Sequence, residues 1–89
     1  MTYRIEVSRT AGRQLSDRLP ESVAAACYEF LSGPLSQNPH RVGNPLHKPF
    51  EGQWRARRGE YRLRYRIDEA TSTVYVLDVD HRREVYRRT

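Results

Sequence analysis

Arginines crowd one short stretch of the chain, where they alternate with residues that favour a buried core. Residues 52–66 read GQWRARRGEYRLRYR, and the six arginines are Arg55, Arg57, Arg58, Arg62, Arg64 and Arg66. A guanidinium group is permanently charged and offers a planar fork of donors that fits phosphate oxygens. Such groups can align a phosphodiester and neutralise the charge that develops as it is cleaved. The spacing therefore indicates a surface for an anionic partner.

The charge of the whole chain supports the same interpretation. The 89 residues carry a formal net charge of +5. From residue 46 onward there are eleven Lys or Arg and seven Asp or Glu, an excess of four, whereas the first 45 residues have an excess of one. Arginine outnumbers lysine fifteen to one, which suits phosphate binding and base stacking better than solubility alone. The alternative is an ordinary solvated sheet face whose arginines pair with neighbouring carboxylates.

Alternation with a period of two predicts the strands that carry these arginines. Residues 3–8 read as a first strand, 53–57 and 60–67 as a hairpin turning at Arg58–Gly59, and 73–80 as the third strand of a meander. In residues 60–67 the tyrosines and Leu63 share one face and the arginines take the other. One face of an antiparallel sheet can remain in water. Five arginines would then project from the face that no helix covers.

Two helices are expected between the first strand and the hairpin. Ser8 can cap the first, with Ala11, Leu15 and Leu19 facing inward. Residues 20–33 form the second, which Gly33–Pro34 should end, and the proline-rich residues 34–50 read as a loop. The order predicts one α+β domain over residues 1–89, with an N-terminal strand, a two-helix hairpin and an antiparallel three-strand meander. Both helices should cover one face of an antiparallel sheet.

Composition makes several other classes of protein poor fits. Cys27 is the single cysteine, so a disulfide framework and a thiolate metal cage are excluded. No apolar run is long enough to cross a bilayer and the N-terminus lacks a signal-peptide core, so we expect no membrane partner and a cytoplasmic protein. Asp78, Asp80 and His81 could be imagined around a divalent ion, but the neighbouring arginines would repel it. We therefore expect no cofactor and no metal.

The C-terminal half resembles a known family. The segments WRARRGEYR, GEYRLRY and HRREVY are similar to those of the RelE/ParE superfamily of toxins from bacterial toxin–antitoxin pairs, and within it to the RelE-type mRNA interferases. The resemblance covers essentially the whole chain. It implies an endoribonuclease that enters the ribosomal A site and cuts mRNA without a metal. There the 2′-hydroxyl attacks the adjacent phosphorus and leaves a 2′,3′-cyclic phosphate and a 5′-hydroxyl.

The resemblance also implies roles for individual residues. Arg62 matches the phosphate-binding arginine of the family, and Arg82, with a one-residue shift, matches the arginine before the terminal EVY. Tyr86 matches the tyrosine of that motif, which stacks on a base. Arg55 and Arg57 lie where RelE-like proteins have lysines. Since arginine cannot act as a base, this departure leaves the proton acceptor unassigned.

Other residues have both a functional and a structural interpretation. His81 is the natural substitute base, because an unperturbed histidine titrates near pH 6.5, or else a turn residue bonded to backbone. Tyr86 could take part in proton transfer, or it could be an edge aromatic packed on the sheet. Arg64 and Lys48, the single lysine, are further candidates for RNA contact. His40 and His47 read as loop residues without a role.

Partners follow from the resemblance as well. It implies a co-expressed acidic, RelB-like antitoxin whose amphipathic helix covers the basic surface, with operator DNA bound only through the toxin–antitoxin complex. Two other functions remain open: a ParE-like toxin that poisons DNA gyrase, and a non-catalytic relative whose arginines only hold RNA phosphates. ParE-like chains lack the basic catalytic set, which favours the nuclease.

Overall fold

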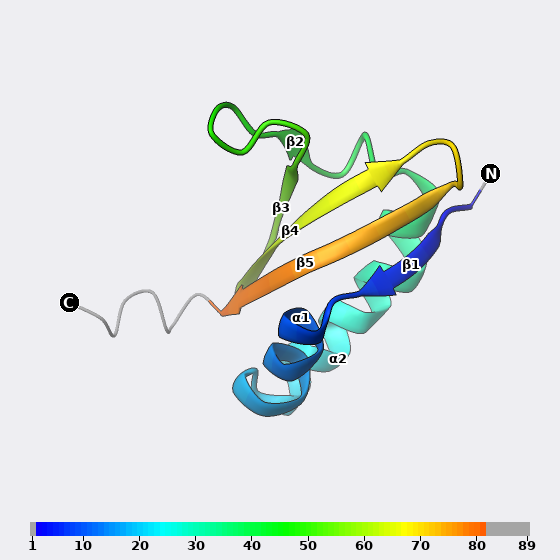
Figure 1. Cartoon of the computed structure of the whole chain (residues 1–89). Helices are drawn as coiled ribbons and strands as arrows, with labels where there is room; N and C mark the ends of the chain where they lie inside the picture. The colour runs from blue at the N-terminus through cyan, green and yellow to red at the C-terminus, as the bar shows by residue number, and fades with distance from the viewer. Residues whose placement is uncertain (1, 82–89) are drawn as a thin grey trace.

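The computed structural model describes residues 2–81 and contains a five-stranded sheet with helices packed on one face (Figure 1). The strands are β1 (Arg4–Val7), β2 (Asn44–Pro45), β3 (Trp54–Arg58), β4 (Tyr61–Asp68) and β5 (Thr73–His81). The helices are α1 (Arg9–Arg13), α2 (Glu21–Phe30) and two π-helical continuations, η1 (Gln14–Arg18) and η2 (Leu31–Leu35). The predicted α+β class and the order of the elements are confirmed.

The strands pair in the order β1-β5-β4-β3-β2. β3, β4 and β5 form the expected antiparallel meander, and β2 adds antiparallel to β3. β1 pairs with β5 in parallel, so the expectation of a wholly antiparallel sheet was wrong. The helical hairpin carries the chain from the end of β1 across one face of the sheet, which lets β1 and β5 run in the same direction.

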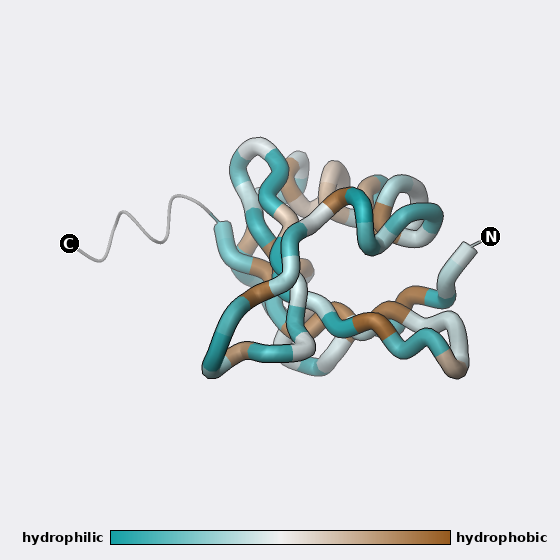
Figure 2. The backbone as a smooth tube through the Cα atoms, turned by 90° about the horizontal axis from the view of Figure 1, so that it is seen from above, coloured by the Kyte–Doolittle hydropathy of each residue, from teal (hydrophilic) through white to brown (hydrophobic). Residues whose placement is uncertain are grey.

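The helices begin and pack as their sequences predict. The Ser8 side chain caps α1 by accepting a hydrogen bond of 3.0 Å from the Ala11 backbone N–H. The inward residues of both helices are buried against Leu63 and Val76 of the sheet. Along the tube in Figure 2, hydrophilic and hydrophobic residues alternate over the strands, as a sheet with one covered face requires.

The second helix runs further than predicted. Gly33–Pro34 does not end it, because α2 continues as η2 to Leu35 and the Asn38 N–H donates to the Pro34 carbonyl at 2.9 Å. In a π-helical turn the hydrogen bonds skip an extra residue, which accommodates a proline that has no N–H to give. The loop expected over residues 34–50 is therefore shorter, and it contains β2.

A register shift in β5 sets which side chains face the helices. Arg64 of β4 pairs with Asp78, but the next residue, Tyr65, pairs with Val76, so Leu77 is an extra residue on β5. Val76 is buried before the shift and Val79 after it. An added residue turns the following side chains to the opposite faces of a strand. Asp78 and Asp80 are thereby placed on the face away from the helices.

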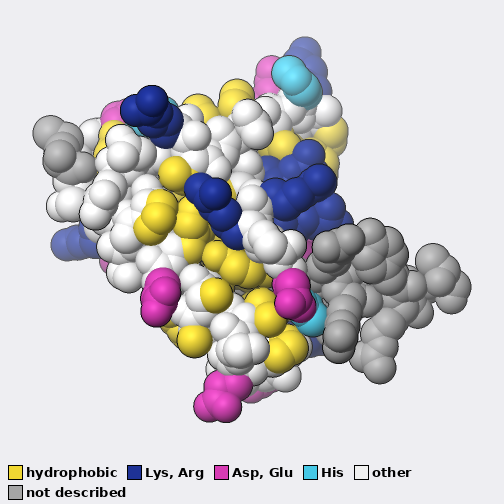
Figure 3. Space-filling model, turned by 180° about the vertical axis from the view of Figure 1, so that it is seen from behind, with side chains coloured by type: hydrophobic (Ala, Val, Ile, Leu, Met, Phe, Trp, Pro, Cys, Tyr) yellow, Lys and Arg dark blue, Asp and Glu magenta, His cyan; other side chains and the backbone are white. Residues whose placement is uncertain are grey.

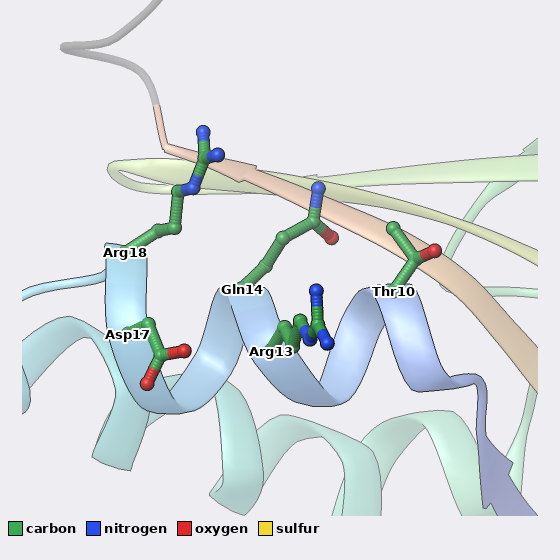
Figure 4. A pocket seen from close by; sticks show the side chains of 5 residues that line it. All are labelled: Thr10, Arg13, Gln14, Asp17 and Arg18. Atoms are coloured by element: carbon green, nitrogen blue, oxygen red, sulfur yellow. The ribbon is translucent and has the colours of Figure 1, made fainter.

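Side chains from the first helix satisfy the backbone of β5 around this shift. The Ser8 hydroxyl donates to the Leu77 carbonyl at 2.7 Å, and the Val79 N–H donates to the Gln14 side chain at 2.6 Å. Figure 4 shows Gln14 reaching from η1 toward β5. It lines a polar hollow of 560 Å³ together with Thr10, Arg13, Asp17 and Arg18.

Within residues 2–81, no helix is long and apolar enough to span a membrane.

Candidate nucleic-acid interface

Backbone pairing aligns the arginines of the hairpin on the sheet face away from the helices. Two rows cross β3, β4 and β5, and these rows are Arg57–Arg62–Asp80 and Arg55–Arg64–Asp78. We call these six side chains the arginine face. Four guanidinium groups and two carboxylates leave an excess of two positive charges. The register makes arginines of β3 and β4 direct neighbours, and their convergence into a pocket for a phosphodiester stays a prediction.

Arg64 is held firmly within this face. Its Nε donates to Asp78 Oδ2 at 2.8 Å, its Nη2 contacts the same oxygen, and its Nη1 donates to Gln53 Oε1 at 3.1 Å. The hydrogen-bonded Asp78 carboxylate raises the pKa of Arg64 above its ordinary value, so Arg64 stays charged. This pair is what the solvated-face alternative expects. Arg64 therefore lends rigidity to the arginine face.

The other arginines of the face are placed differently. The ion pairs found within residues 2–81 do not include Arg55, Arg57 or Arg62. Arg55 and Arg57 are exposed and Arg62 is half-buried. Figure 3 shows Lys and Arg side chains gathered in a dark blue group on the β3 side of the molecule. Like charges directly opposite each other on neighbouring strands destabilise a sheet, so an anion that binds between Arg57 and Arg62 would relieve that repulsion.

A loop at residues 46–53 borders the arginine face. It carries Phe50, whose ring centroid lies 5.3 Å from the Arg64 guanidinium carbon, and Gln53, which binds the same guanidinium. Lys48 is exposed in this loop. Phe50 and Gln53 were not among the predicted site residues. The signal for Phe50 was an aromatic residue within the polar loop segment HKPFEGQ.

The proline-containing loop that precedes β3 is fastened to the sheet beneath this border. The Tyr65 hydroxyl donates to the Pro39 carbonyl at 2.6 Å. Gly43 lies against β3 and β4. A Cβ added there would meet the Arg55 carbonyl of β3 at 2.8 Å and would overlap the Tyr65 hydroxyl of β4. These contacts fix the start of β3, which carries Arg55 and Arg57.

His81 lies on the other side of the sheet from the arginines. It pairs with Tyr61, whose side chain is in the core, and it is only 5% exposed. Its Nε2 lies 3.5 Å from Glu60 Oε1 in the β3–β4 turn. The register shift at Leu77 accounts for this orientation, because it turns the residues that follow. Arg82 and Tyr86 lie outside the described residues.

The arginine face can hold and polarise a phosphodiester. Paired guanidinium forks fix phosphate oxygens and neutralise developing negative charge, which are two requirements of backbone cleavage through a neighbouring hydroxyl. Asp78 is engaged by Arg64, so its Oδ2 is bound to a cation already. The net positive charge of the face favours an anion over a metal ion.

Comparison with known proteins identifies the family. A model of the ParE toxin of type II toxin–antitoxin systems matches residues 5–86. Toxin RelG from Mycobacterium tuberculosis is 49% identical over 88 residues, which cover 99% of this chain and all of the relative. Toxin RelE from the same organism is 47% identical over 85 residues, covering 96% of this chain and 87% of the relative.

A solved structure agrees with these relatives. The toxin–antitoxin complex RelBE2 from M. tuberculosis contains a chain that superposes with a TM-score of 0.89 at 48% identity, covering 92% of this chain and all of that one. The fold, the arginine-bearing hairpin and these similarities lead to one conclusion. This chain belongs to the RelE/ParE superfamily and is a RelE-like toxin of a type II toxin–antitoxin system.

Proposed function

We propose that this toxin is a ribosome-dependent endoribonuclease that cuts mRNA in the ribosomal A site and thereby inhibits translation. The observation that carries the proposal is the register that sets Arg57 directly opposite Arg62 on a face where neither is paired with a carboxylate among residues 2–81. The close identity to toxins named RelE and RelG supports the RelE-type activity. Since its substrate is mRNA on ribosomes, the toxin would act in the cytoplasm.

The proposed reaction needs no metal or cofactor. The 2′-oxygen of the RNA attacks the adjacent phosphorus, the bond from phosphorus to the 5′-oxygen breaks, and the products are a 2′,3′-cyclic phosphate and a 5′-hydroxyl. One proton leaves the attacking hydroxyl and one reaches the departing oxygen. Arg62 binds and neutralises the phosphate, and Arg55 and Arg57 align the strand on either side. Arg64 orients the face, and Lys48 adds a contact from the loop.

The proton acceptor is assigned here to the C-terminal motif. His81 is buried on the helix side and faces Glu60, so we assign it to positioning the β3–β4 turn and not to proton transfer. Tyr86 then combines stacking on a base with proton transfer, and Arg82 supplies a second phosphate contact. The base stacking of Tyr86 and the phosphate contact of Arg82 come from the family resemblance, whereas proton transfer by Tyr86 is our own assignment.

We further propose a small RelB-like antitoxin as the regulatory partner. The similar M. tuberculosis chain was solved as a toxin–antitoxin complex. An acidic, amphipathic helix would match the positive excess of the arginine face. DNA would bind through the antitoxin in that complex. If no small protein co-purifies with the toxin when the native operon is expressed, this part of the proposal fails.

The experiment that tests the proposal is the mapping of mRNA 5′ ends after induced expression. We expect new 5′ ends inside translated reading frames, none of them with the Arg62→Ala variant, and suppression when the antitoxin is co-expressed. Arg66→Ala is the matched control, because Arg66 shares the strand and the face but lies over the Tyr75 ring at 5.3 Å. Unchanged 5′ ends on induction of the unaltered toxin would refute nuclease activity.

A gyrase-directed function is the second candidate, because the matching family model is described as a ParE toxin. The two functions separate in one assay. A gyrase poison would block DNA supercoiling by purified gyrase and leave programmed ribosomes and their mRNA intact. The nuclease would cut the mRNA on programmed ribosomes and leave DNA supercoiling by gyrase unchanged.

A further inference from the structure

Phe50 is an exposed aromatic side chain at the border of the arginine face. It is 44% exposed, although large apolar residues of this chain are mostly buried. Its ring lies 5.3 Å from the guanidinium carbon of Arg64, which pairs directly with Arg55 across the strands. Aromatic rings beside cationic groups are the combination with which proteins bind single-stranded nucleic acid, since bases stack on the rings and phosphates contact the charges.

Hydrogen bonds within the loop fix the backbone that carries this ring. The Phe50 N–H donates to the His47 carbonyl at 2.9 Å, and the Phe50 carbonyl accepts from the Gln53 N–H at 3.0 Å. Gly52 has a φ of 88°, a conformation that glycine adopts without strain and that closes this turn. The Leu46 N–H also donates to the Gln53 carbonyl at 2.8 Å. An aromatic side chain on such a tight loop loses little freedom when it binds a base.

The Arg64 guanidinium beside the Phe50 ring is fixed as well. Arg64 is bound by Asp78 and by the Gln53 side chain, so the guanidinium beneath the ring has a set position. A structural role of Phe50 would be satisfied by covering Arg64 alone. That role does not explain why a large apolar ring remains nearly half exposed at the border of the arginine face, where water contact is unfavourable.

We propose that Phe50 is a base-stacking residue that binds a nucleotide of the mRNA next to the scissile phosphate. This role rests on the proposed nuclease function and deepens it. With Tyr86 assigned to the C-terminal motif, the toxin has a second aromatic contact, carried by the loop at 46–53. Stacking on Phe50 sets the RNA strand so that its backbone crosses the arginine face toward Arg62.

The experiment measures cleavage of mRNA on programmed ribosomes by purified toxin variants, with kcat and KM determined separately. Phe50→Leu keeps an apolar side chain over Arg64 but removes the aromatic face. We expect its KM to rise about 5- to 150-fold, the equivalent of one stacking contact, with kcat little changed. Phe50→Tyr should restore the KM. Tyr28→Leu is the control, because Tyr28 is a 52% exposed aromatic on α2, which packs against the opposite face of the sheet.

Each outcome has a distinct meaning. A wild-type KM for Phe50→Leu, while the unaltered toxin cleaves normally, overturns the stacking role and leaves the nuclease proposal standing. A loss that Phe50→Tyr does not reverse, or a fall in kcat alone, also overturns it, since it reflects the placement of Arg64. If the unaltered toxin fails to cleave, the nuclease proposal fails and the role of Phe50 fails with it.

Discussion

At the scale of single residues, the arginines of the arginine face have different roles. Arg64 is bound to Asp78 and Gln53 and serves as a fixed part of the sheet, whereas Arg57 and Arg62 face each other without a carboxylate partner in residues 2–81. The sequence predicts that these arginines share a face, because alternation follows from strand geometry. It does not predict which of them Asp78 neutralises, since that depends on register between strands.

The burial of His81 changes which residue we propose as the proton acceptor. We predict that His81→Gln retains cleavage within a few-fold of the unaltered toxin, because His81 lies on the helix side of the sheet. Tyr86→Phe should lower kcat by about 10²–10⁴-fold, the usual contribution of acid–base catalysis. Single-turnover cleavage rates on programmed ribosomes measure both. A large loss for His81→Gln in a protein that unfolds normally in urea would return the base to His81.

At the scale of elements, the shift in β5 determines the composition of the arginine face. Residues 73–80 alternate well enough to predict a strand, but Leu77 breaks the phase in the middle of it. A strict period of two would put Asp78 on the same face as Val76, in the core. Nothing local in the sequence marks the extra residue, since Leu77 suits either face. Its position follows from partners that are far away in the chain, Ser8 and Gln14.

Substitution of Gln14 tests whether its contact with β5 stabilises the shifted strand. We predict that Gln14→Ala destabilises the fold by about 1–3 kcal/mol, because the Val79 N–H, in a strand that is buried there, loses its acceptor. Urea unfolding followed by circular dichroism measures the free energy of unfolding. Thr10→Ala, in the same polar hollow, is the control and should change it by less than about 0.5 kcal/mol. Equal effects of the two substitutions would contradict a specific role for Gln14.

The helices illustrate what local sequence does and does not determine. The Ser8 cap and the inward positions such as Leu15 and Cys27 are confirmed, because capping and a helical period depend on neighbouring residues. The predicted end of the second helix was wrong. Proline was expected to end it, but packing of Leu31 and Leu35 in the core favours continuation, and a π-helical turn makes this possible.

At the scale of the whole molecule, the fold separates a neutral core from a charged face. Among the buried groups of residues 2–81, burial raises the pKa of the Cys27 thiol to about 11 and the pKa of the Tyr61 and Tyr65 phenols to about 12. All three are neutral when folded near neutral pH. In the unfolded chain they ionise at their ordinary values, near 9 for the thiol and 10 for the phenols.

This difference predicts a loss of stability in alkali. Above pH 9 the unfolded chain releases these protons before the folded protein does, so the free energy of unfolding should fall between pH 9 and 12. Each group lowers it by about 1.4 kcal/mol for each unit by which its pKa in the folded protein exceeds its pKa in the unfolded chain. Urea unfolding at pH 8, 9.5 and 10.5 measures the decline. Cys27→Ala should delay its onset to about pH 10, where unperturbed phenols ionise. A free energy of unfolding that stays constant to pH 10.5 would contradict the burial of these groups.

We propose that the arginine face cleaves mRNA on the ribosome through the 2′-hydroxyl. The most direct measurement is cleavage, by purified toxin, of an mRNA programmed into the A site either as all-ribose RNA or with one 2′-deoxynucleotide at the scissile position. We predict a 2′,3′-cyclic phosphate product from the first and no cut in the second. Arg62→Ala should be slower by about 10²–10³-fold and Arg66→Ala should match the unaltered toxin. Equal cleavage of both RNAs, or a wild-type rate for Arg62→Ala, would contradict the claim.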